Sequence, residues 1–153
     1  MSRTALSPRL GIHRGRYKPQ ADRLLEKVRQ HYIYPPGENR ASGYLSTDMV
    51  WVEPIVDDLA ELLGIRFTIL ALQGYKDGTA GTAWHADDNF GDQAILSLGV
   101  TRLFGIRRGG LDASYLLDAG DLVHMPSGLE HRIIPQPDIS GERVALVFRM
   151  PAQ

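Results

Sequence analysis

Two histidines and one carboxylate are the residues best suited to hold a metal ion. The chain of 153 residues contains no cysteine, so a metal must be bound by His, Asp or Glu. His85 and Asp87 stand two residues apart, and in an extended segment such residues point to the same side. With His131 as a third ligand they form the donor set of non-haem iron(II) oxygenases. The pattern alone leaves an ordinary polar role for each histidine open. His124 is expected to face away from His131.

Two arginines in one apolar segment are the second chemically distinctive feature. Arg143 and Arg149 stand six residues apart in RVALVFR, so on a strand they share one face and lie about 20 Å apart. They project either into solvent or into the mouth of a barrel. In the second case their planar forks suit a short dicarboxylate. Gln73 and Tyr75 also share a face of an earlier strand and are candidates to hydrogen-bond the same ligand.

The elements that must position these residues fall into two groups. Apolar residues recur at helical spacing over residues 20–31 and 51–63, where Gly64 closes the second helix. Residues 32–50 have no period and are expected to form an irregular loop. Beyond Gly64 the period becomes two, which predicts short strands at 66–75, 93–99, 101–107, 113–117, 121–125, 130–134 and 142–150. This order predicts a mainly β fold, a jelly roll with two helices packed on one sheet.

The stretch from Arg66 to Met150 resembles the AlkB-like family of iron(II) and 2-oxoglutarate dependent dioxygenases. The matching segments, in the order of the family, are Tyr75-Lys76-Asp77-Gly78, Trp84-His85-Ala86-Asp87-Asp88, Ser97-Leu98-Gly99, Gly120-Asp121-Leu122-Val123, His131 and the segment from Arg143 to Arg149. The resemblance implies a double-stranded β-helix core that uses Fe(II), 2-oxoglutarate and O2. It implies that His85, Asp87 and His131 are the iron ligands. It also implies that Arg143 binds the distal carboxylate of 2-oxoglutarate and Arg149 the end nearer the metal, with Tyr75 assisting.

The sequence departs from the family in places that bear on the substrate. Gln73 and Ala145 replace the usual asparagine and polar residue, and Asn89 replaces the usual glutamate. The nucleotide-recognition lid is reduced to residues 32–50. The resemblance favours an alkylated base in nucleic acid, with Tyr44, Arg40, Asp88 and Asn89 as candidate substrate contacts. The alternatives are hydroxylation of a protein side chain or small molecule, and a jelly-roll binding module without catalysis.

Charge is distributed unevenly along the chain. Residues 1–30 hold eight basic groups against two acidic ones, a charge of +6, whereas the remaining 123 residues carry −7. A basic segment on an acidic body could bind the phosphates of a nucleic acid, or it could be a solvated terminus with one charged helix face.

Composition indicates an ordinary globular protein, with 43% hydrophobic and 23% charged residues. No apolar run approaches the roughly 18 residues of a membrane span, and the first 20 residues lack the apolar centre of a secretory peptide. We therefore expect a cytoplasmic monomer with no membrane association. The chain is predicted to be a single domain, 1–153, in which residues 1–64 form the basic arm, helices and short lid and residues 65–150 form the core.

Overall fold

The computed structural model describes residues 10–152. Two α-helices, α1 (Ala21–Arg29) and α2 (Glu53–Leu63), lie close to the positions expected from the sequence. Leu24 and Val28 are buried on one face of α1, because residues four apart lie above one another on a helix. Helix α2 ends at Gly64, whose φ of 72° is the left-handed conformation that glycine adopts without strain. No helix within these residues is both long enough and apolar enough to cross a membrane.

Within residues 10–152, nine strands form two antiparallel sheets. The larger sheet has the order β1-β7-β4-β9-β3-β2 and the smaller has the order β6-β5-β8. The strands of the larger sheet are β1 (Gly11–His13), β2 (Arg40–Leu45), β3 (Ile69–Tyr75), β4 (Phe90–Gly99), β7 (Leu122–Met125) and β9 (Arg143–Pro151). Those of the smaller sheet are β5 (Arg102–Arg108), β6 (Leu111–Leu117) and β8 (Glu130–Ile133).

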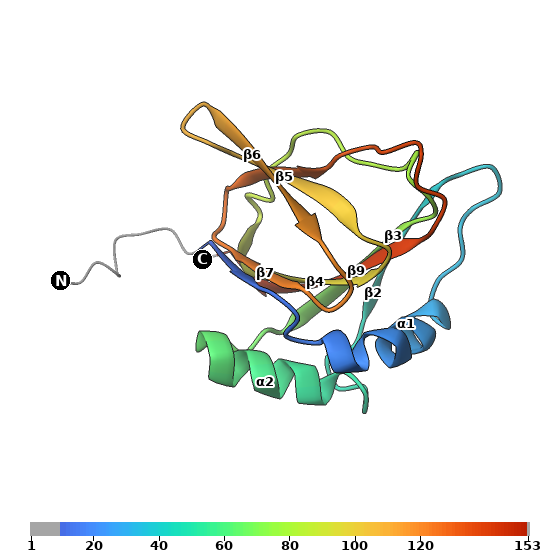
Figure 1. The fold of residues 1–153 in the computed structure, drawn as a ribbon. Helices are drawn as coiled ribbons and strands as arrows, with labels where there is room; N and C mark the ends of the chain where they lie inside the picture. Colours follow the sequence, from blue (N-terminus) through green and yellow to red (C-terminus); the bar gives the residue numbers. More distant parts are fainter. Residues whose placement is uncertain (1–9, 153) are drawn as a thin grey trace.

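The two faces of the larger sheet pack against different partners. Figure 1 shows both helices on one side of this sheet and strands β5 and β6 on the other. Alternate residues of strand β9 face opposite sides of the sheet. Val144, Leu146 and Phe148 join the helices in one hydrophobic core. Ala145 and Val147 belong to a second core between the sheets. Arg143 and Arg149 therefore point toward the space between the sheets, and the alternative that they face solvent is excluded by their exposures of 1% and 9%.

The region 32–50 differs from the expected irregular loop. Its residues Arg40–Leu45 form β2, which pairs with β3 from Arg40↔Tyr75 to Leu45↔Leu70. The segment RASGYL lacks a clear apolar alternation, so its pairing is set by the neighbouring strand instead of by its own propensity. Strand β1 was also not expected, and it pairs with β7 along only three residues.

Candidate metal centre

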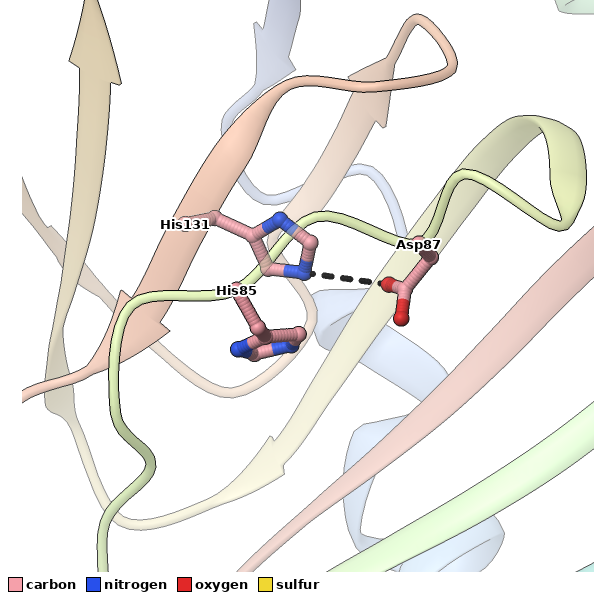
Figure 2. A group of neighbouring side chains, drawn as sticks. All are labelled: His85, Asp87 and His131. Carbon is pink, nitrogen blue, oxygen red and sulfur yellow. Dashed lines mark ion pairs between the residues drawn. The ribbon is translucent and has the colours of Figure 1, made fainter.

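Three predicted ligands converge between the sheets. The backbone of His85 pairs with that of His131 on β8, with N···O distances of 3.1 and 2.9 Å. Asp87 follows two residues later and returns to the same side. Each of the three residues offers one ligand atom, and these atoms all lie within 4.8 Å of one another. Figure 2 shows the two imidazoles and the carboxylate facing a common point, with His131 Nε2 3.3 Å from Asp87 Oδ2.

Backbone carbonyl groups fix the orientation of both imidazoles. Nδ1 of His85 lies 2.8 Å from the carbonyl oxygen of Ala83, and Nδ1 of His131 lies 2.8 Å from that of Leu129. Because a carbonyl oxygen only accepts, each Nδ1 carries a proton, and Nε2 is the nitrogen of each ring that is left to bind a metal. Such an arrangement is usual for histidines that bind metals. The sequence did not identify these partners, although both lie two residues before their histidine.

Asp87 is held as a carboxylate. Its pKa lies well below the ordinary value, mainly because of the hydrogen bond with His131, and despite partial burial that opposes ionisation. The amide of Gln93 donates a further hydrogen bond of 3.0 Å to Asp87 Oδ2. The three residues therefore offer two imidazole nitrogens and one carboxylate oxygen, a donor set that fits a divalent ion such as Fe(II).

A cavity of about 150 Å³ adjoins these three residues. Its walls come from both sheets and include Gln73, Tyr75, Phe104, Ile133 and Ala145. The ring of Phe104 stacks on His131 with centroids 5.9 Å apart. The cavity is smaller than the roughly 300–1,000 Å³ of pockets that enclose drug-sized ligands, so it suits one ligand of metabolite size.

Arg143 is a buried residue in the wall of this cavity and has few partners among the described residues. Its only hydrogen bond to another described side chain goes to Ser97 Oγ at 3.0 Å. Its Nε is buried and has no partner among the described residues. The guanidinium lies 5.2 Å from the centre of the Tyr75 ring. Burial lowers the pKa of Arg143 to about 10, so the group is charged at neutral pH and is placed to receive an anion.

Gln93 connects the second arginine to the candidate metal ligands. Arg149 Nε donates to Gln93 Oε1 at 3.2 Å, while the amide nitrogen of Gln93 reaches Asp87. Gln93 and Ser97 were not among the predicted site residues. A signal was present in residues 93–99, where Gln93 and Ser97 are the two polar residues and stand four apart, so that they share one face of the strand. The register places them opposite Arg149 and Ala145.

The other predicted contacts separate into two groups. Gln73 and Arg40 line the cavity, where Arg40 Nη2 donates to Gln73 Oε1 at 2.7 Å and its guanidinium stacks 4.2 Å from the Tyr75 ring. Tyr44 is 68% exposed on β2. Asp88 and Asn89 are exposed after Asp87 and, like Tyr44, are not among the residues that line the cavity.

The basic N-terminal segment lies against the acidic body in its described part. Arg14, Arg16 and Arg29 form ion pairs of 2.6–2.9 Å with Asp121, Asp58 and Glu142, respectively. Arg3 and Arg9 lie outside the described residues. Arg16 also lines a groove between the helices. Both helices lie on the side of the larger sheet away from β5 and β6 (Figure 1).

His124 lies apart from the candidate centre, in agreement with the expectation. Its Nε2 is 3.1 Å from Asp92 Oδ2, and it lines a surface depression together with His13.

Comparison with known proteins supports the fold. No protein-family model matches the sequence, and neither does any curated protein sequence. Among solved structures, the chain is similar to the crystal structure of a Pseudomonas putida prolyl-4-hydroxylase, with a TM-score of 0.73 and 14% sequence identity. The match covers 96% of this chain and 94% of that chain. At this identity the likeness shows a shared fold. It gives no support to the narrower resemblance to AlkB-like proteins.

Proposed function

We propose that this protein is an Fe(II) and 2-oxoglutarate dependent hydroxylase with a jelly-roll core. The observation that carries the proposal is the convergence of His85, Asp87 and His131 on one side of a small cavity that also contains Arg143 and Arg149. A binding module without catalysis would have no need for a metal donor set beside two buried cations. The fold likeness to a prolyl-4-hydroxylase supports the same class of enzyme.

The residues present fit both the iron and the dicarboxylate. Two imidazoles and one ionised carboxylate are the ligands that iron(II) takes in such sites. The orphaned Nε of Arg143 is a buried donor without an acceptor, and leaving it so costs about 1–3 kcal/mol. A carboxylate of 2-oxoglutarate would satisfy it, and Tyr75 lines the same cavity next to Arg143.

Bound iron and 2-oxoglutarate would supply the oxidising chemistry, in which a substrate C–H, O2 and 2-oxoglutarate give C–OH, succinate and CO2. The chain itself holds and orients the reactants. Ala83 and Leu129 carbonyls keep the imidazoles in one tautomer, and Gln93 fixes the Asp87 carboxylate relative to Arg149. The apolar walls, including Phe104 and Val147, exclude water from the cavity.

For the substrate we favour an aliphatic C–H bond in a protein side chain or small molecule over an alkylated base. The cosubstrate would fill a cavity of about 150 Å³, so the substrate must react at the mouth of the cavity. Part of the expected nucleotide lid, residues 32–50, forms strand β2 instead. Half of the basic groups in the described N-terminal segment are paired with carboxylates. A prolyl hydroxylase as structural neighbour also favours hydroxylation.

The test is to measure iron(II) binding by the metal-free protein and then succinate release with 2-oxoglutarate, ascorbate and candidate substrates. We expect a single iron site, succinate release stimulated by amino acids or peptides, and little stimulation by methylated oligonucleotides. His124→Ala is the matched control, since this histidine is partnered by Asp92 outside the cavity. Failure to bind iron in the wild-type protein would contradict the proposed function, and stimulation by methylated oligonucleotides alone would restore dealkylation.

A further inference from the structure

Arg40 is an arginine in the wall of the cavity that the proposed chemistry leaves without a role. It lies on β2 opposite Tyr75 of β3, and Tyr75 in turn lies opposite Arg143 of β9. Directly opposite residues of antiparallel strands share one face of the sheet, so the three side chains form a row along the cavity that all of them line. Both guanidinium groups lie close to the Tyr75 ring, at 4.2 Å for Arg40 and 5.2 Å for Arg143.

The two arginines of this row differ in their hydrogen bonds. Each of the three guanidinium nitrogens of Arg40 donates to a protein oxygen, namely Nε to the carbonyl of Gly74 at 3.1 Å, Nη1 to that of Gly81 at 3.3 Å and Nη2 to Gln73 Oε1 at 2.7 Å. Arg143 donates to one side chain, and its buried Nε has no partner within the described residues. Arg143 therefore has a donor left for an anion, whereas the donors of Arg40 hold other parts of the protein in place.

The bond from Arg40 fixes the direction of the Gln73 amide. A side-chain amide has an accepting oxygen on one side and a donating nitrogen on the other, and an arginine nitrogen only donates. Oε1 of Gln73 is therefore the atom that faces Arg40, and Nε2 is the atom left for the cavity that Gln73 lines. An amide turned the other way would present its oxygen to a bound carboxylate and repel it. The bond to Arg40 excludes this second orientation.

We infer that Arg40 is a positioning residue, which holds the Gln73 amide with its nitrogen toward the carboxylate of 2-oxoglutarate and holds the Tyr75 ring beside Arg143. The inference rests on the proposed function and assigns how the cosubstrate site of that function is kept ready for its ligand. Donors that are already oriented lose little freedom when the ligand binds, and this raises affinity. Arg40 acts through Gln73 and Tyr75 and does not itself contact the cosubstrate.

The first test separates the bond to Arg40 from the donor in the cavity. Gln73→Glu keeps an acceptor for Arg40 but replaces the donating nitrogen by a carboxylate oxygen. We expect the melting temperature of the ligand-free variant to be unchanged or higher, because the acceptor now carries a charge. The Kd for 2-oxoglutarate, measured by calorimetry on the iron(II)-loaded protein without oxygen, should rise at least tenfold through loss of a hydrogen bond to a charged group. An unchanged Kd would overturn the inference.

The second test is a double-mutant cycle between Arg40 and Gln73. Arg40→Lys keeps the positive charge but lacks the planar fork that makes three directed bonds, so it should raise the Kd for 2-oxoglutarate by about tenfold, nearly as much as Gln73→Leu. Adding Gln73→Leu to Arg40→Lys should then weaken binding little further, since coupled residues are not additive. Wild-type affinity in Arg40→Lys would show that only the charge matters, and effects that multiply would show that the two residues act independently. Either result would overturn the inference.

Arg107→Lys is the matched control. The Arg107 guanidinium also lies 4.2 Å from an aromatic ring, that of Trp84, and Arg107 is not among the residues that line the cavity. Its substitution should leave the Kd for 2-oxoglutarate unchanged, and a loss equal to that of Arg40→Lys would overturn the inference. Failure of the wild-type protein to bind 2-oxoglutarate would instead contradict the proposed function. The two failures are thus distinguished by the wild-type titration.

Discussion

Replacing Arg143 by methionine should weaken the binding of a dicarboxylate without lowering the stability of the protein. Arg143 is 1% exposed and is compensated only by Ser97 Oγ and the face of Tyr75. Burying an ion costs several kcal/mol unless it is well paired. Methionine has a similar length and no charge, so Arg143→Met removes this cost and fills the same space.

The expected effects of Arg143→Met on stability and on 2-oxoglutarate binding have opposite signs. Replacing buried ionic groups by apolar ones of similar volume is often neutral or stabilising by about 1–4 kcal/mol, and each kcal/mol raises the melting temperature of a chain of this size by about 2–4 °C. Removing one partner of a buried pair costs about 3–5 kcal/mol, which weakens 2-oxoglutarate binding by roughly a hundredfold or more.

The assay is thermal unfolding of the metal-free protein with and without 2-oxoglutarate. For the wild type, ligand at 100 times its Kd should add about 2.7 kcal/mol to the free energy of unfolding. The variant should unfold at the same temperature or higher and gain almost nothing from the ligand. Arg66→Met is the control, because Arg66 and its partner Asp57 are both more than half exposed, and exposed pairs contribute little.

Two results would refute this reasoning. A large fall in the melting temperature of the ligand-free variant would show that Arg143 supports the fold by contacts stronger than those described. An unchanged response to 2-oxoglutarate would place the dicarboxylate elsewhere in the protein.

Three further predictions follow from the same structure. His131→Ala should abolish iron(II) binding measured by calorimetry, whereas His124→Ala should retain it; equal losses would contradict the assignment of the ligands. Gln93→Leu should weaken iron binding by about 10–100-fold through loss of its hydrogen bond to Asp87, and an unchanged affinity would remove Gln93 from the site. Burial opposes ionisation of Glu142, but hydrogen bonds from two tyrosines and an arginine outweigh it and lower its pKa below the ordinary 4.5. Its carboxylate therefore stabilises the fold above about pH 4.5 and loses this effect in acid, so Glu142→Gln should cost about 1–3 kcal/mol at pH 7 and less at pH 3.5 in urea unfolding; an equal cost at both pH values would contradict this.

Much of the framework could be predicted because it depends on periodicity. The helices at 21–29 and 53–63 and seven of the strands follow from apolar spacing, and Gly64 marks a helix end. Strand β2 was missed because its pairing with β3 is decided by a neighbour distant in sequence. A local pattern carries no information about such a contact.

The candidate ligands could be predicted from residue type, but their supports could not. His85, Asp87 and His131 belong to the residue types that can bind iron in a cysteine-free protein, and the chain has only five histidines. The carbonyl partners of the imidazoles are backbone groups of Ala83 and Leu129, which have no signature in their side chains.

The predicted lid at residues 32–50 shows another limit of sequence reasoning. Tyr32 and Tyr34 in the predicted lid donate their hydroxyl groups to Glu142, and aromatic residues in a loop do not reveal whether they meet a ligand or a buried carboxylate.

Strand β9 explains how a small protein can keep a charged cavity beside a stable core. Its alternate residues face opposite sides, so Val144, Leu146 and Phe148 pack under the helices while the two arginines face the cavity. The apolar face buries side chains that each contribute about 1.5–3 kcal/mol, and this burial offsets the cost of the cations on the other face. The apolar residues and the two arginines thus belong to the same strand, which lies in the most buried part of the sheet. The distance between the arginines is therefore fixed by the strand itself and does not depend on a loop.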